Sequence, residues 1–340
     1  MLPLFCQLRR LPDAFAAFML GCCLVSVSIF SVEADDKPSV VVASKGETTV
    51  NPTRIASHHL ENLHRLSITT PGKTSNAAPG DVSRDYYLGG SPETEEAMAE
   101  LAAAGVKTVI SVDGAPPLVE LARKHGLTYI HIPVKYSTLT REQIVTITAA
   151  LERTKDNVYL HCHHGKHRGP AALVAALKCT HPEIETDPLL KLFGTDPKYG
   201  GLYSAAHSVT PLQAEELTKV PVKLPESITT ATPARMMAEI DARFDRLKKI
   251  PTPLPPADID LLQTLSVELE EDFREFGRLG KDPESSRKLL DDSIATVIQL
   301  RQFAESAKAG RSGVVPAEKV QALVLRLEQS CKICHKQHRD

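Results

Sequence analysis

Strand and helix signals alternate along residues 57–222, and this alternation constrains the fold more than any other feature of the sequence. Three apolar runs, at residues 106–112, 127–134 and 157–162, predict buried strands. Segments with helical start and stop signals separate them. Strands interleaved with helices typically form a parallel sheet that is covered on both faces. We therefore expect residues 57–222 to form an α/β domain with a central, mainly parallel sheet flanked by helices.

The pattern changes after a proline- and threonine-rich linker at residues 223–232, and the sequence from 233 to 340 is helical. Apolar residues spaced three and four apart mark four amphipathic helices, within residues 237–247, 262–276, 290–303 and 320–334. Amphipathic helices with short connections typically form an antiparallel four-helix bundle. A chain of 340 residues has room for this second domain.

The first 34 residues differ from the rest of the chain. Two arginines precede an apolar run at residues 14–32, and residues 32–34 are similar to a small-residue cleavage site. This pattern predicts an export signal at residues 1–34, a flexible arm at 35–56 and a periplasmic protein. The alternative is a retained membrane anchor, because the run is close to spanning length.

Charge and cysteine content narrow the classes of function. The formal net charge is −2, which gives no electrostatic reason to expect a nucleic-acid partner. Seven cysteines are few for a chain of this length, so a disulfide scaffold is not expected.

The segment "VYLHCHHGKHRGP" at residues 158–170 places Cys162 five residues before Arg168. Between a buried strand and a helix, the backbone N–H groups of such a loop can surround an oxyanion, and the helix dipole adds positive potential. Gly165 allows the turn, Arg168 can bind two oxygens at once, and the same field favours the thiolate of Cys162. The residues expected to line the anion site are His163, His164, Gly165, Lys166 and His167.

Two other interpretations of this loop exist. The four histidines could form a metal site, although neighbouring positions in a tight loop converge poorly on one ion. A sulfur-transfer loop of the rhodanese type also places a cysteine in an anion-binding loop.

The loop resembles the His-Cys-x5-Arg signature of cysteine-dependent tyrosine and dual-specificity phosphatases, and the resemblance covers roughly residues 57–210. It implies a phosphorylated substrate, protein or small molecule, and a phosphocysteine intermediate on Cys162 that water hydrolyses. The family usually has serine or threonine after the arginine, where this chain has Gly169. Its general acid is usually an aspartate after the "Ile-Pro-Val" strand. This chain has "KYSTLTRE" there, which leaves Glu142 and Asp113 as candidate acids.

A second motif, "CKICH" at residues 331–335, matches the pattern for covalent attachment of c-type haem. Cys331 and Cys334 would add to the two vinyl groups, and His335 would coordinate the iron from the same helical turn. A zinc half-site, a disulfide between the two cysteines and a chance match are the alternatives.

The last hundred residues resemble the cytochrome c-prime and c556 family, whose helix bundles have CxxCH near the C-terminus. The resemblance implies covalent haem c, and bundle cytochromes of this type often dimerise. Met236 and Met237 are candidate axial ligands, although core packing is the alternative role for both. An axial methionine would favour electron transfer with a redox partner, and an open iron site would bind nitric oxide or carbon monoxide.

Two functions follow from these motifs. The first is an exported phosphatase fused to a c-type cytochrome. The second is a catalytically inactive phosphate-binding domain on an electron-transfer cytochrome.

Overall fold

The computed structural model describes residues 48–70, 82–229, 232–279, 284–310 and 317–338. The export signal expected at residues 1–34 and the arm expected at 35–56, as far as residue 47, lie outside these ranges. Within the described ranges, no helix combines the length and apolar character that a membrane span requires.

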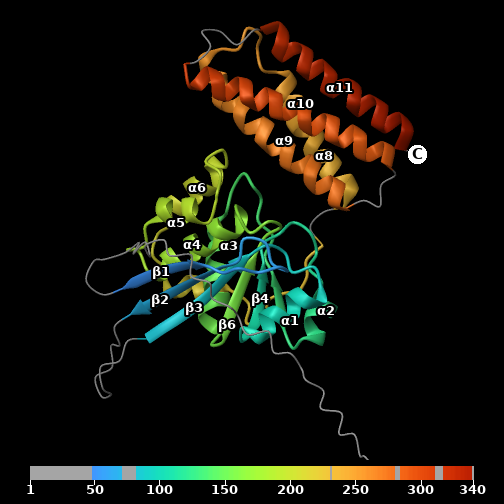
Figure 1. Cartoon of the computed structure of the whole chain (residues 1–340). Coiled ribbons are helices and arrows are strands. Elements are labelled where there is room, and N and C mark those ends of the chain that lie inside the picture. Colours follow the sequence, from blue (N-terminus) through green and yellow to red (C-terminus); the bar gives the residue numbers. More distant parts are fainter. Residues whose placement is uncertain (1–47, 71–81, 230–231, 280–283, 311–316, 339–340) are drawn as a thin grey trace, which may run out of the picture. The chain divides into compact units, whose positions relative to one another are not determined.

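A six-stranded mixed sheet forms the centre of the α/β domain, with the strand order β1-β2-β3-β6-β4-β5 (Figure 1). Strands β1, β2 and β3 pair antiparallel, whereas β3, β6, β4 and β5 pair parallel. Strand β6 therefore has a parallel neighbour on each side, and its carboxyl end lies in the middle of the sheet edge. The strands are β1 Thr49–Arg54, β2 His64–Thr70, β3 Val82–Gly89, β4 Val106–Ser111, β5 Thr128–His131 and β6 Asn157–His161.

The α/β domain with a sheet flanked by helices is confirmed, but the sheet begins earlier than residue 57. Strand β1 lies inside the segment that was expected to be a flexible arm. Along β1 only Val50 and Pro52 are buried, because the strand is at the sheet edge and one of its faces meets solvent. A half-polar edge strand of this kind lacks the continuous apolar run that marks a buried strand.

Two groups of helices accompany the sheet. Helices α1 and α2 contact each other, and they contact β4 and β5 respectively. Helix α4 contacts β3, β6, α3, α5 and α6, so nearly all of its side chains are buried. The alanines of α4 allow its neighbours to approach closely. The helices are α1 Glu95–Ala103, α2 Val119–Lys124, α3 Arg141–Arg153, α4 Arg168–Thr180, α5 Thr186–Leu192, α6 Gly200–His207 and α7 Ala214–Lys219.

The C-terminal region consists of four long helices that share an apolar core. They are α8 Pro233–Lys248, α9 Ile259–Leu279, α10 Glu284–Lys308 and α11 Ala317–His338, with the 3-10 turn η1 Pro256–Asp258 before α9. Helix α9 packs against α8 and α10, and α10 packs against α11. The Thr232 side chain caps α8 by accepting a hydrogen bond from Arg235 N, and Pro233 occupies the first turn, as helix starts favour. Each predicted apolar stripe falls within one of these helices.

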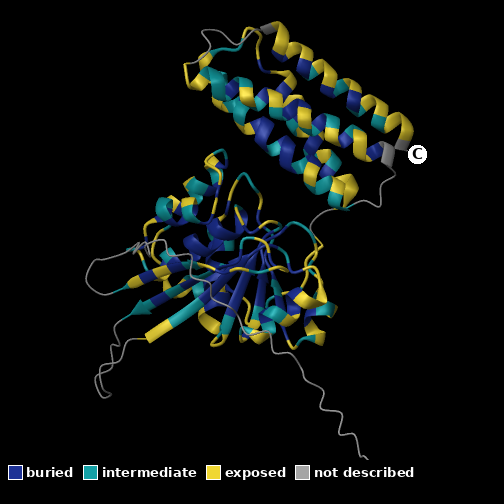
Figure 2. Ribbon diagram, in the orientation of Figure 1, coloured by how far each residue is buried: buried dark blue, intermediate teal, exposed yellow. Residues whose placement is uncertain are grey.

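Buried apolar side chains form one core in the α/β domain and another among α8 to α11 (Figure 2). The first core joins the sheet to α3, α4, α5 and α6, and it includes Val158 and Leu160 of β6. In a densely packed core, a change in side-chain volume of even one methylene group shifts the neighbouring residues. Substitutions in α4 are therefore expected to disturb the position of the residues at the end of β6.

We predict that Leu173→Ala in α4 destabilises the α/β domain by ~2–5 kcal/mol, because it removes a fully buried side chain and leaves a cavity. The matched control is Leu118→Ala at the N-cap of α2, where the side chain is 47% exposed. That change should alter the free energy of unfolding by no more than about 0.5 kcal/mol. Urea unfolding followed by circular dichroism measures both, and equal losses in the two variants would contradict the assigned core.

Candidate active site

The turn from β6 into α4 forms a loop at residues 162–168, here called the cradle. Strand β6 ends at His161 and α4 begins at Arg168. Since β6 lies between β3 and β4, the cradle opens at the carboxyl ends of parallel strands, where ligands of α/β proteins typically bind. The first turn of α4 adds unpaired N–H groups and a positive dipole end.

Gly165 makes the tight turn in the cradle. Its φ is +70°, and a Cβ on this residue would lie 2.2 Å from the carbonyl carbon of Gly89 and 2.6 Å from Gly90 N. A side chain at this position would therefore clash with the backbone that follows β3. Only glycine combines the left-handed conformation with this close approach.

Carbonyl groups of the cradle point outward and are held there by neighbouring segments. The donors are Ser91 N to His163 O, Asn62 Nδ2 to His164 O and Thr195 Oγ1 to Lys166 O, each at 2.8 Å. Donors outside the loop thus occupy these three carbonyls. Backbone N–H groups of a loop whose carbonyls are engaged in this way can serve an anion.

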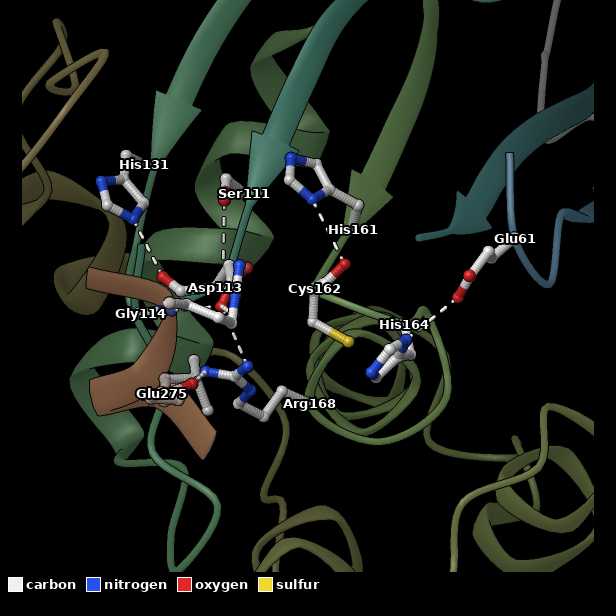
Figure 3. A network of polar contacts seen from close by, with 12 residues as sticks. Glu61, Ser111, Asp113, Gly114, His131, His161, Cys162, His164, Arg168 and Glu275 are labelled. Atoms are coloured by element: carbon white, nitrogen blue, oxygen red, sulfur yellow. Dashed lines mark hydrogen bonds and ion pairs between the residues drawn. The ribbon is translucent and has the colours of Figure 1, made fainter. Parts of the chain in front are cut away.

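Cys162 and Arg168 are both buried at the cradle (Figure 3). Arg168 is 1% exposed, and its guanidinium contacts Asp113 Oδ1 at 2.9 Å and the hydroxyl of Tyr136 at 3.0 Å. The guanidinium also lies 4.0 Å from the centre of the Tyr136 ring, a cation–π contact. These contacts fix the side chain of Arg168 beside the loop.

Asp113, which follows β4, is ionised and positions Arg168. Burial opposes ionisation of this carboxyl, but Arg168 and Arg278 hold its pKa well below the usual range. Arg278 donates to Oδ2 at 2.7 Å and to Oδ1 at 3.2 Å. A carboxylate in this state has no proton to donate at neutral pH, so the geometry favours a positioning role over that of a general acid.

Glu142, the other candidate acid, is exposed on the first turn of α3. Among the described residues, it is not part of the lining of the two cavities at Tyr136. The "KYSTLT" segment itself turns tightly, with a bridge between Lys135 and Thr138. A Cβ on Gly201 would lie 1.8 Å from Ser137 O, so α6 packs directly against this turn.

Three histidines in or next to the cradle, His161, His163 and His167, are neutral at pH 7. Burial lowers the pKa of His161, His163 and His167 to about 4. His161 also stacks on Tyr159, with ring centres 5.9 Å apart. In the part of the chain that is described, no group of three or more His, Cys, Asp or Glu side chains could hold a metal ion. His163 and His167 thus contribute to the wall of the cradle without adding positive charge.

Glu275 and Arg278 of α9 also reach the cradle, and sequence analysis missed both. Glu275 Oε1 lies 2.5 Å from Arg168 Nη1, and Arg278 pairs with Asp113. Both residues are more than a hundred positions from Arg168, so no local pattern connects them to the loop. Tyr136 lies in the "KYSTLTRE" segment, where the phosphatase pattern assigns no role to a tyrosine, so sequence did not predict its contact with Arg168.

The CxxCH motif lies near the C-terminal end of α11 and lines a cavity of about 220 Å³. Cys331, Cys334 and His335 share this cavity with Met237 and with the apolar side chains of Ile240, Phe244, Phe273, Leu289 and Leu290. Burial raises the pKa of Cys331 to about 11. Met236 is buried and lines a different cavity, so only Met237 of the two candidate ligands accompanies the motif.

Comparison with known proteins identifies a phosphatase-like segment in the α/β domain. Residues 86–181 match the family model Tc-R-P, described as "Polymorphic toxin system, DSP-PTPase phosphatase". The match includes the whole cradle and ends before the four C-terminal helices. A comparison with curated proteins finds no match.

Solved structures of several phosphatases are similar to this part of the chain. A protein of Shewanella putrefaciens CN-32, assigned as a DUF442 phosphatase, is 20% identical over 36% of this chain and 83% of its own, with a TM-score of 0.31. TpbA of P. aeruginosa is 15% identical over 39% and 83%, with a TM-score of 0.32. The kinase-associated phosphatase, with serine for its catalytic cysteine, is 13% identical over 40% and 89%, with a TM-score of 0.33. Residues 86–181 of the α/β domain thus match a family of dual-specificity and tyrosine phosphatases.

Proposed function

We propose that the α/β domain hydrolyses phosphate monoesters through a phosphocysteine intermediate on Cys162. The observation that supports this most directly is the cradle: a buried cysteine and a buried arginine bracket a loop whose carbonyls point outward. N–H groups and a guanidinium together stabilise the charge on the three equatorial oxygens of a phosphoryl group. The substrate is a phosphorylated protein or small molecule.

In the first step, Cys162 Sγ attacks phosphorus as the bond to the ester oxygen breaks, and the leaving oxygen departs with that electron pair. In the second step, water attacks phosphorus and loses a proton to solvent. The S–P bond breaks with its electron pair returning to Cys162 Sγ, and inorganic phosphate leaves. Arg168 and the loop N–H groups hold the phosphoryl oxygens in both steps. The departing oxyanion takes one proton from solvent in the first step, which balances the proton that the attacking water releases in the second.

Protonation of the leaving group is the weakest part of this site. Asp113 is ionised and held by two arginines, so it does not supply the proton. General acid catalysis typically contributes about 10²–10⁴ in rate. Aryl phosphates need it least, because a phenolate leaves without a proton more easily than an alkoxide. The domain is therefore expected to prefer aryl over alkyl phosphates.

We predict that Cys162→Ser lowers the rate of aryl phosphate hydrolysis by at least about 10³-fold, because the attacking thiolate is lost. The matched control is Cys179→Ser, at a buried cysteine near the end of the same helix, α4. It should retain the activity of the wild type. Release of nitrophenolate from nitrophenyl phosphate measures both. Equal rates in Cys162→Ser and wild type would exclude the phosphocysteine route.

We further propose that the C-terminal helices form a c-type cytochrome of the four-helix bundle kind. The residues present suit a haem: two thiols and an imidazole lie on one face of α11, beside an apolar cavity. Cys331 and Cys334 would form the thioether links, and His335 would bind the iron. Haem bound there would supply one-electron chemistry, exchanged with a redox partner, in an exported, periplasmic protein that could pair as a homodimer.

Met237 is the side chain best placed to complete the iron coordination. It lines the cavity of the CxxCH motif, whereas Met236 packs elsewhere. A thioether ligand would favour electron transfer. If Met237 instead packs beside the ring, the open position would admit nitric oxide or carbon monoxide.

We predict that the purified chain, matured with a c-type attachment system, has a Soret band and retains haem after denaturation. Changing both Cys331 and Cys334 to serine should remove the denaturation-resistant haem, because no thioether can form. Cys179→Ser serves again as the control and should keep it. A haem stain of a denaturing gel measures all three proteins, and an unstained wild-type band would contradict the cytochrome proposal.

Gly169 favours a second candidate function, a phosphate-binding domain without turnover. The family usually has a hydroxyl at this position to assist departure of the thiolate, and here a Cβ would lie 3.5 Å from Cys162 Sγ and 3.2 Å from Leu88 Cδ1. A serine could thus be accommodated with a small shift of Leu88.

We predict that Gly169→Ser accelerates hydrolysis, because it places a hydroxyl beside the sulfur. Steady-state rates on nitrophenyl phosphate test this, with Gly169→Ala as the control for the added Cβ alone. Measurable phosphate binding without turnover in the wild type, together with turnover in Gly169→Ser, would favour the second candidate.

A further inference from the structure

Arg168 is almost completely buried, although a residue that binds phosphate in an open site would be accessible to its ligand. Its side chain is 1% exposed, and Cys162 is 2% exposed. Three partners from the α/β domain contact the guanidinium: Asp113, Tyr136 and the carbonyl of Val134. A further partner among the described residues is Glu275, which belongs to the C-terminal helices.

Glu275 contacts the guanidinium that would bind a phosphoryl group. Its Oε1 lies 2.5 Å from Arg168 Nη1 (Figure 3). Arginine binds carboxylates and phosphates through the same N–H groups and with the same geometry. A carboxylate at this distance therefore competes directly with a phosphoryl group for the guanidinium.

Arg278, one helical turn after Glu275, contacts the other side of the same charge group. It donates two hydrogen bonds to Asp113, which in turn accepts from Arg168. The four side chains alternate in sign, in the order Glu275, Arg168, Asp113 and Arg278. Residues three positions apart on a helix lie on one face, so α9 presents both of its members together.

Further contacts fix α9 at this place. The Tyr199 hydroxyl donates to Glu271 Oε1 at 2.5 Å, and Lys198 Nζ lies 3.5 Å from Glu270 Oε2. Val267 belongs to the apolar core of the α/β domain. Both polar and apolar contacts thus precede Glu275 along the helix, so its carboxylate is held at Arg168 by more than one ion pair. Burial raises the pKa of Glu275, and Arg168 opposes this shift.

We propose that α9 is an autoinhibitory element, in which Glu275 occupies the phosphate position of the cradle and must leave before substrate binds. The inference rests on the proposed phosphatase function and adds its regulation. The structure has the covered state, and the open state requires exchange of the Glu275–Arg168 contact for a phosphoryl–Arg168 contact. No bond is made or broken in this exchange.

The test is calorimetric titration of inorganic phosphate into the full chain, comparing wild type with Glu275→Gln. The glutamine keeps the size of the side chain but removes the competing charge. Phosphate should bind about tenfold more tightly to the variant, as expected when one charge-assisted contact no longer competes. Glu275→Ala, which removes the side chain, should show the same direction of change.

The control is Glu305→Gln in α10, where the carboxylate pairs with Arg301 of the same helix. It should bind phosphate as the wild type does. Equal phosphate affinity in wild type, Glu275→Gln and Glu275→Ala would overturn the autoinhibition while leaving the cradle as an anion site. If none of the proteins bound phosphate, both the autoinhibition and the proposed phosphatase function would be wrong.

Hydrolysis of nitrophenyl phosphate separates autoinhibition from catalysis by the same residue. Autoinhibition predicts that Glu275→Gln lowers KM with kcat unchanged or raised, because the carboxylate competes with substrate binding. A fall in kcat would make Glu275 a participant in the reaction and would overturn the proposal.

Discussion

A buried guanidinium determines much of this structure. Taking Arg168 out of water is costly unless its N–H groups all meet acceptors or opposite charge. The strand order meets part of this requirement, since β4 lies beside β6 and delivers Asp113 next to the start of α4. Among the described residues, Arg168 Nε has no hydrogen-bond partner. The turn at Tyr136 adds a hydroxyl and a ring face. The carboxylate of Glu275 then balances the remaining charge, so the cradle and α9 share one electrostatic unit.

Local chemistry explains why part of this site could be predicted from sequence. Cys162, Gly165 and Arg168 lie within seven positions, and the strand before them and the helix after them are strongly apolar. Their relation is therefore fixed by one turn, whose conformation Gly165 reveals. The same holds for Cys331, Cys334 and His335, which a single helix places on one face. In both cases the residues lie so close along the chain that their sequence separation determines how far apart they are in the structure.

The parts that sequence did not predict depend on contacts between distant segments. Nothing near Glu275 distinguishes it from the other acidic residues of α9, because its partner is contributed by another domain. The position of Asp113 after a strand makes it a candidate general acid in the sequence. The structure adds two arginines beside it, which lower its pKa and keep it ionised. Strand β1 likewise gains its order from pairing with β2, not from its own polar composition.

Helix α9 contacts both the core of the C-terminal helices and the α/β domain. Leu265, Leu269 and Phe273 face the core of the C-terminal helices, and Phe273 lines both the CxxCH cavity and the cavity beside the cradle. Glu271, Glu275 and Arg278 meet the α/β domain. Each residue advances an α-helix by about 100°. Inserting or deleting one residue in the middle of α9 would rotate the residues after that point by about 100° relative to those before it. Contacts with the C-terminal core and contacts with the α/β domain would then be lost together, so both sets of contacts constrain the length of this helix.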